Sequence, residues 1–199
     1  MRARDQPDPC GLARSPYAAI RQVANGAATA IRAHDASVTL SASVQVETAW
    51  GKFSNGPYVG VDTDFADFPF IQVLGLSSYP YFVWLTPEAL PADYYSRLLI
   101  GHAVPVGVVE GGWTSSSFST VVSSSDIQQR YITRQSQLLD GVNATAWFQL
   151  TFTDLELHAL APALAAGLLP FSRLGLVDSA FTAKPALSVW DGIFARPHP

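Results

Sequence analysis

Residues 104–113, VPVGVVEGGW, decide the fold of this chain. The run begins as a β-branched segment typical of a buried strand and ends abruptly in Glu110, two glycines and Trp113. A carboxylate directly after a buried strand is costly unless something uses it, and the glycines allow a sharp turn that leaves room beside it. We therefore expect a strand that presents a functional carboxylate, although a structural Glu paired with a neighbouring strand is the alternative.

Three other stretches have the pattern of strands. Residues 38–47 and 144–154 alternate between apolar and polar side chains, whereas residues 70–76 form an apolar run. Helices are expected on periodicity and end signals at residues 15–34, 90–101, 126–139 and 185–194. Strands that alternate with helices indicate a parallel sheet.

The alternating strands indicate a barrel, because strands of an open parallel sheet usually read as continuous apolar runs. In a barrel one face of each strand packs on outer helices and the other lines an interior that becomes polar near the active site. Four strands are too few for an eight-stranded barrel, which usually takes ~250 residues. The predicted fold class is α/β, a partial TIM (β/α)8 barrel comprising about strands five to eight with their helices. Residues 1–14 are expected to be a tail or loop, and 15–199 a single half-barrel domain.

Composition excludes several classes of protein. The 199 residues are 48% hydrophobic and 14% charged, which is not the composition of a disordered chain. A formal net charge of -4 gives no electrostatic reason to bind nucleic acid. No apolar run approaches the ~18 residues of a membrane span, and no signal peptide is visible. One cysteine and four scattered histidines give no metal site, and we expect no cofactor.

Active sites of this fold lie at the carboxyl ends of the strands. Glu110 is the predicted catalytic residue, and Trp113 would supply an apolar wall for a sugar ring. Polar or aromatic residues at the ends of the predicted strands complete the candidate list: Glu47, Ser77, Ser78, Tyr79, Trp113, Trp147 and Asp154.

Four of the aromatic or acidic candidates are predicted to bind substrate beside Trp113. Trp147 lies on the polar face of its strand and is expected to form the floor of the sugar site, and Trp50 a further wall. Tyr79 either orients the nucleophile, touches the sugar or packs in its loop. Glu47 is interpreted as binding substrate or supporting a residue that does.

Several segments together resemble a known family. Residues 108–113 are similar to the strand-seven motif, and residues 75–81 to the strand-six segment, of retaining glycoside hydrolases in the (β/α)8 clan that includes endo-β-1,4-galactanases. Residues 146–148 with Asp154 resemble strand eight, and residues 175–190 resemble the closing segment and last helix. The resemblance implies that Glu110 is the nucleophile of a retaining glycosidase and that the substrate is a carbohydrate.

The chain departs from that family at one position. The family's general acid/base is a Glu after strand four, typically in an Asn-Glu pair, and residues 1–14 offer only Asp5 and Asp8. Glu47 is the internal substitute, but strands ~4.8 Å apart put it ~9–10 Å from Glu110. Retaining chemistry needs ~5–5.5 Å and inverting chemistry ~6.5–9.5 Å. The isolated chain is therefore expected to be incomplete as an enzyme.

Two functions remain open on sequence grounds. One is a retaining glycoside hydrolase, whose relatives are commonly secreted or periplasmic. The other is a non-catalytic half-barrel that binds a carbohydrate or a partner. Its open sheet edges would permit self-association or complementation by a partner chain. A third possibility is another barrel enzyme that has a Glu at the end of strand seven.

Overall fold

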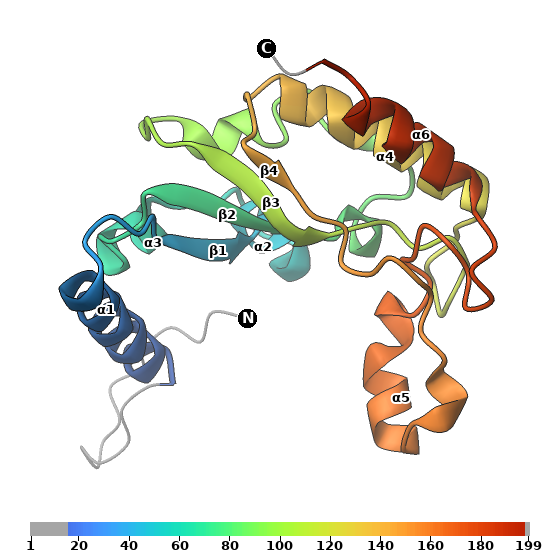
Figure 1. Cartoon of the computed structure of the whole chain (residues 1–199), viewed down its shortest axis with the longest axis horizontal. Coiled ribbons are helices and arrows are strands. Elements are labelled where there is room, and N and C mark those ends of the chain that lie inside the picture. Colours follow the sequence, from blue (N-terminus) through green and yellow to red (C-terminus); the bar gives the residue numbers. More distant parts are fainter. Residues whose placement is uncertain (1–15, 198–199) are drawn as a thin grey trace.

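The computed structural model describes residues 16–197, which form one parallel sheet with helices on both sides (Figure 1). The sheet has four strands in the order β1-β2-β3-β4, each parallel to its neighbour. Their bounds are Ser41–Gln45 for β1, Val73–Ser78 for β2, Val106–Gly111 for β3 and Ala146–Trp147 for β4. The predicted tail at residues 1–14 and the helix cap at Ser15 lie outside the described residues.

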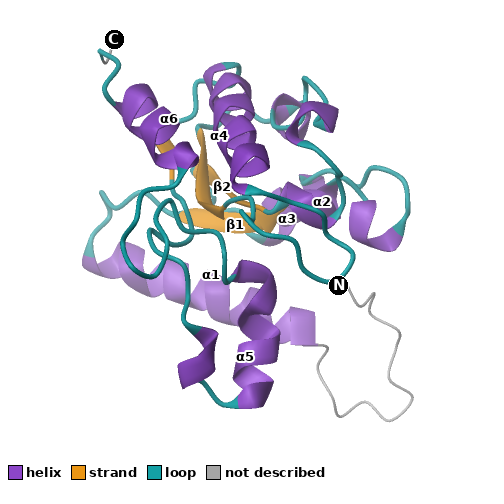
Figure 2. Cartoon of the chain, turned by 90° about the vertical axis from the view of Figure 1, so that its right-hand side faces the viewer, coloured by secondary structure: helices purple, strands orange, loops and turns teal. Residues whose placement is uncertain are grey.

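The helices separate into two groups (Figure 2). The helices α4 and α6 pack on each other over one side of the sheet, whereas α1 and α5 lie on the other side. The two short helices α2 and α3 follow β1. The bounds are Pro16–His34 for α1, Val46–Ala49 for α2, Asp62–Asp67 for α3, Ser125–Asp140 for α4, Pro162–Leu168 for α5 and Pro185–Phe194 for α6. None of these described helices is long and apolar enough to cross a membrane.

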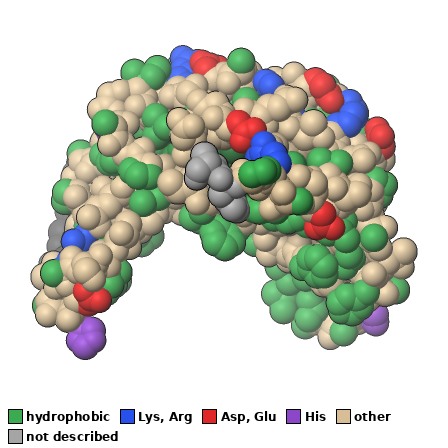
Figure 3. Space-filling model, turned by 45° about the horizontal axis from the view of Figure 1, so that its top comes forward, with side chains coloured by type: hydrophobic (Ala, Val, Ile, Leu, Met, Phe, Trp, Pro, Cys, Tyr) green, Lys and Arg blue, Asp and Glu red, His purple; other side chains and the backbone are tan. Residues whose placement is uncertain are grey.

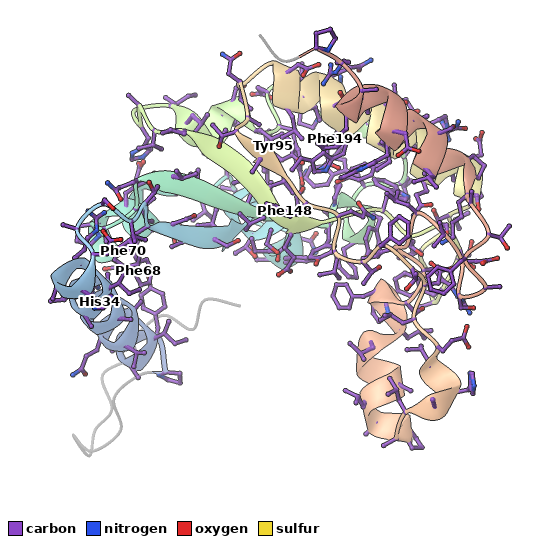
Figure 4. The ribbon with its side chains drawn as sticks, in the orientation of Figure 1. His34, Phe68, Phe70, Tyr95, Phe148 and Phe194 are labelled. Carbon is purple, nitrogen blue, oxygen red and sulfur yellow. The ribbon has the colours of Figure 1, made fainter. Side chains whose placement is uncertain are left out.

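The core lies between the sheet and the α4–α6 layer. Alternate residues of β2 and β3, such as Leu76 and Val108, are fully buried there against Tyr131 and Ile132 of α4. Tyr95 and Phe194 lie in the same region (Figure 4). The apolar period of two therefore marks the face that packs on helices, as the barrel interpretation requires.

The opposite face of the sheet is open. Ser41 and Ser43 of β1 are exposed, as are Val109 and Phe148, whose exposed fractions are 40% and 58%. Figure 3 shows the molecule as an arch, with a hollow between two legs that α1 and α5 form. In a closed barrel this face would line the interior. The structure is thus a partial TIM barrel, as predicted.

Three predicted elements are wrong in detail. The predicted strand 38–47 ends early, because Val46 and Glu47 form the first turn of α2. Residues 90–101 form turns and a 3-10 helix, Ser96–Leu99, instead of an α-helix. Pro91 lies at the start and Gly101 takes a φ of 85° at the end, while Tyr94 and Tyr95 are both buried by non-helical turns. The predicted strand 144–154 pairs regularly only at Ala146–Trp147, because the following residues leave the ladder after single bonds to β3.

Candidate active site

Glu110 is exposed at the carboxyl end of β3, and two hydroxyls hold it there. Its Oε1 accepts a hydrogen bond from Ser77 Oγ at 2.9 Å and another from Tyr79 Oη at 2.8 Å. Both donors come from the end of β2. Hydrogen bonds to a carboxylate are among the stronger ones in proteins, so the orientation of the Glu110 side chain is well defined.

An irregularity in the sheet brings these groups together. Leu76 pairs with Val108, but the next residue, Ser77, pairs with Glu110, so Val109 is passed over. A bulge of this kind re-aims the side chains that follow it. Glu110 therefore lies beside Ser77.

The glycines after Glu110 allow β3 to approach β2 closely. A Cβ on Gly111 would lie 2.6 Å from the carbonyl oxygen of Ser78, a distance that excludes any side chain. Gly112 has a φ of 151° and donates its N–H to the same oxygen at 3.2 Å. Glycine is therefore required here for the close approach of the two chains and for the positive φ.

Tyr79 is held rigidly as a neutral donor. Its side chain packs edge-on against Phe171, with ring centroids 5.1 Å apart. Burial, followed by the hydrogen bond to Glu110 and its negative charge, raises the pKa of Tyr79. The phenol therefore stays protonated at neutral pH and donates a hydrogen bond to the carboxylate. Of the roles considered for Tyr79, the structure shows contact with Glu110.

Glu47 is near Tyr79 but faces away from solvent. It lies in the first turn of α2 with 0% exposure, and its Oε1 accepts from Tyr79 N at 2.9 Å and from Tyr94 Oη at 2.5 Å. Gln45 Nε2 donates to the other carboxylate oxygen. Burial raises the pKa of Glu47 to about 7, and the hydrogen bonds only partly offset this effect.

Trp113 is placed in the core. Its side chain is 1% exposed, packs against Tyr81 and Tyr131 at centroid distances of 6.0 and 5.3 Å, and donates to Ser123 Oγ. The unusual φ of Gly112 turns the chain inward at this point. Trp113 therefore packs beneath the end of β3 and has no exposed face on which a sugar ring could stack.

The two remaining candidate tryptophans, Trp147 and Trp50, also pack against other aromatic residues. Trp147 packs against Trp190 and Phe194 of α6, with centroids 4.6 and 5.9 Å apart, so it points opposite to the expected direction. Trp50 stacks on Tyr94 at 5.9 Å and donates to its carbonyl oxygen at 2.9 Å. The structure thus brings Tyr79 directly to Glu110, whereas Trp113, Trp147 and Trp50 make contacts elsewhere.

Asp154 is committed to a buried ion pair. Its side chain is 4% exposed and contacts Lys184 Nζ, Arg173 Nη1 at 3.4 Å and the N–H of Gly175 at 3.1 Å. Burial lowers the pKa of Lys184, although the carboxylate opposes that effect. Within residues 16–197, no three His, Cys, Asp or Glu side chains are grouped to hold a metal ion.

A small polar cavity lies next to the loop that follows β3. Its volume is about 250 Å³, and its lining includes hydroxyls of Thr114, Ser116 and Ser117 together with Phe118 and Arg173. Hydroxyls, a cation and an aromatic ring are groups that can contact a sugar.

The sequence did not predict the contacts of Ser77 and Tyr94. Ser77 appeared among the strand-end polar residues, but nothing in the pattern showed that the bulge would place it beside Glu110. Tyr94 lies in the predicted helix 90–101, and nothing in that pattern showed that its hydroxyl would contact Glu47. Only tertiary contacts between segments 47 residues apart reveal that role.

The fold is a partial (β/α)8 barrel, and Glu110 is a carboxylate at the end of one of its strands. Solved glycoside hydrolases share this fold. Ruminococcus gnavus β-glucuronidase in complex with uronic isofagomine matches with a TM-score of 0.62 and 13% identity over 93% of this chain and 30% of that chain. The β-glucuronidase of an uncultured Clostridium species matches with a TM-score of 0.59 and 16% identity, covering 89% of this chain and 30% of that chain.

A carbohydrate-active transferase also matches. An active-site mutant of Rhizomucor miehei β-1,3-glucanosyltransferase in complex with laminaritriose gives a TM-score of 0.54 and 16% identity over 83% of this chain and 56% of that chain. This chain thus spans under a third of the glucuronidases and about half of the transferase. No family model and no curated protein matches it. At these identities the similarity establishes the fold.

Proposed function

We propose that this chain carries the nucleophile of a retaining glycoside hydrolase, and that Glu110 is that nucleophile. The observation that supports this role is the exposed carboxylate at the end of β3, whose Oε1 is held by Ser77 and Tyr79. Both hydrogen bonds go to Oε1, which leaves Oε2 as the oxygen that would attack. A nucleophile oriented in this way loses little freedom when it reacts.

The reaction would proceed through a covalent intermediate. An electron pair of Glu110 Oε2 forms a bond to the anomeric carbon while the bond from that carbon to the leaving oxygen breaks. A general acid gives its proton to the leaving oxygen, and water later displaces the Glu110 ester. The two hydroxyls on Oε1 hold the carboxylate during attack and stabilise it when it leaves.

The general acid would come from the strand–helix units that complete the barrel. Among the described strand-end carboxylates, Glu47 is fully buried and Asp154 is paired with Lys184. Neither is placed to reach the oxygen of a sugar bound at Glu110. This agrees with the missing Asn-Glu pair in the sequence.

We propose a β-linked sugar of the glucose or glucuronic acid type as the substrate class. The solved structures that share the fold are named as β-glucuronidases and a β-1,3-glucanosyltransferase. The cavity beside Thr114 and Arg173 would bind a further sugar unit, because the Arg173 guanidinium group can donate to sugar oxygens and Phe118 offers an aromatic ring.

The direct test is covalent labelling followed by mass spectrometry. The probes are 2-deoxy-2-fluoro-β-glucosyl fluoride and its glucuronyl counterpart, whose good leaving group largely bypasses the acid. A glycosyl group mapped to Glu110 is the expected result. Label on another residue, or none on protein shown to be folded, would overturn the assignment.

A second candidate is a non-catalytic half-barrel that binds a partner. Within residues 16–197, β1 and β4 each pair on one side only, and the open face exposes Phe148 and Phe152 by 58% and 57%. Unpaired edges and exposed aromatic rings favour association with another half-barrel or with a second copy.

Sedimentation over a range of concentrations separates the two candidates. Concentration-dependent association that weakens in Phe148→Ser, but persists in the control Leu85→Ser, which changes another exposed apolar residue, would support the partner-binding candidate. A folded monomer at all concentrations would rule out self-association through this face.

A further inference from the structure

Glu47 and Glu110 are connected through a single peptide unit, the one between Ser78 and Tyr79. The carbonyl oxygen of this unit accepts the N–H of Gly112 at 3.2 Å, and its N–H donates to Glu47 Oε1 at 2.9 Å. The unit is therefore hydrogen-bonded to Gly112, just after β3, on one side and to Glu47 in α2 on the other.

This peptide unit lies between the two groups that hold Glu110. Ser77 precedes it and Tyr79 follows it, and each donates its hydroxyl to Glu110 Oε1, at 2.9 and 2.8 Å. A rotation of the unit would move the Tyr79 ring relative to Ser77, and one of the two hydroxyls would leave the carboxylate. The orientation of the unit thus decides whether both bonds can form.

Glu47 is itself held firmly. Tyr94 donates to the same Oε1 at 2.5 Å, and Tyr94 is fixed by its stack on Trp50 and by contact with Ser78. A carboxylate is a costly group to bury, and the cost is offset only where several donors converge on it. Three donors do so here, from Gln45, Tyr79 and Tyr94.

We infer that Glu47 is a positioning residue that sets the orientation of the Ser78–Tyr79 peptide, and through it the hydrogen bonds to Glu110. Glu47 acts behind the site and does not touch the sugar. This role rests on the proposed nucleophile for its importance to catalysis. The hydrogen-bonded chain from Glu47 to Glu110 can nevertheless be tested without any substrate.

The test follows the Tyr79 ring by NMR in the full chain, with tyrosine labelled by ¹³C at Cζ. The chain has seven tyrosines, and Tyr79→Phe identifies the resonance. Glu110→Gln defines the shift that results from loss of the carboxylate charge at the phenol. Glu47→Ala is expected to move the Tyr79 resonance in the same direction, because the peptide loses its acceptor and the hydroxyl leaves Glu110.

Glu47→Gln is the conservative rescue. Its amide oxygen still accepts from Tyr79 and Tyr94, and Gln45 can turn its own amide to present an oxygen to the new NH2 group. The Tyr79 resonance should stay near its wild-type position. If Glu47→Ala does not fold, Glu47→Asp replaces it, since the shorter carboxylate withdraws from the Tyr79 N–H and should give a smaller shift of the same sign.

Gln128→Ala is the control, because Gln128 is also 0% exposed and its amide donates to the carbonyl oxygens of Trp113 and Leu174, which lie outside the Ser78–Tyr79 peptide. It should leave the Tyr79 resonance unchanged. A Tyr79 signal that ignores Glu47, or that moves as much in Gln128→Ala, would overturn the inference. Failure of sugar labelling with a Tyr79 signal that follows Glu47 would remove the nucleophile role alone.

Discussion

Glu47 and Glu110 bind opposite ends of one residue, because Tyr79 donates its backbone N–H to Glu47 at 2.9 Å and its hydroxyl to Glu110 at 2.8 Å. One of these carboxylates is fully buried and the other is exposed. The two acids therefore have different environments and are expected to respond differently to substitution and to pH.

Glu110→Gln should abolish covalent labelling while preserving the fold. The amide cannot attack the anomeric carbon, so the labelling rate should fall by at least ~1,000-fold. Mass spectrometry measures the rate, and circular dichroism checks the fold. The control is Glu88→Gln, which changes an exposed carboxylate paired with Arg130 and should label normally. Near-normal labelling of Glu110→Gln would remove this residue from the chemistry.

Tyr79→Phe should slow labelling by about 10- to 100-fold, the loss expected for one hydrogen bond to a charged group. The ring still packs and the backbone N–H still reaches Glu47, so stability should change little. Tyr81→Phe is the matched control, because the Tyr81 hydroxyl donates at 3.0 Å to the carbonyl oxygen of Pro170. Equal rates for the two variants would mean that the Tyr79 hydroxyl does not assist Glu110.

Glu47 should make stability depend on pH. Burial raises its pKa from 4.5 to about 7, so the folded protein binds this proton more tightly than the unfolded chain does. Its contribution to the free energy of unfolding is thus full below pH ~4.5 and is lost as the pH rises to ~7, by an amount on the order of 3 kcal/mol.

Urea unfolding of the wild type and of Glu47→Gln at several pH values measures this dependence. The wild-type free energy of unfolding should fall relative to that of Glu47→Gln as the pH rises through this window. A difference between the two proteins that does not change with pH would show that Glu47 titrates normally.

Gly111→Ala should destabilise the protein by about 2 kcal/mol or more, because its Cβ would meet the Ser78 carbonyl oxygen at 2.6 Å. Gly167→Ala in α5 is the control, since a Cβ there meets nothing within 4 Å, and it should be neutral or stabilising. Thermal unfolding compares the two. A Gly111→Ala protein as stable as the wild type would show that β3 need not approach β2 so closely.

Lys184→Met should cost about 2–3 kcal/mol in the free energy of unfolding, because it leaves the Asp154 carboxylate buried with a weaker partner. Arg196→Met breaks the exposed pair with Asp140 and should have little effect. Urea unfolding gives both values. Asp154→Asn combined with Lys184→Met should recover part of the loss, and a further loss instead would contradict this account.

Much of the fold could be predicted because strong local patterns specify it. The β-branched run before Glu110 became β3, and the helices α1, α4 and α6 lie within a few residues of their expected bounds. Period-two alternation, however, shows which residues share a face and does not show which face meets the helices. Trp147 was assigned to the wrong side of its strand for this reason.

The candidate site was predictable only in part. Glu110 and Tyr79 could be chosen because each lies near the carboxyl end of a strand, and the carboxyl ends of parallel strands meet at one edge. The burial of Glu47 and Trp113 depends on the path of the chain after each strand, which in the second case includes a Gly112 φ of 151°. Local propensity carries no information about such contacts between distant segments.

The bulge between β2 and β3 has an evolutionary consequence. Ser77 lies opposite Glu110 only because Val109 is passed over in the pairing. Loss of one residue from β3 would put a different side chain at this position, whereas most point substitutions in the strand would leave the alignment intact. Lineages that keep this chemistry should therefore accept exchanges at Val109, whose side chain is 40% exposed, but tolerate almost no insertions or deletions between residues 106 and 112.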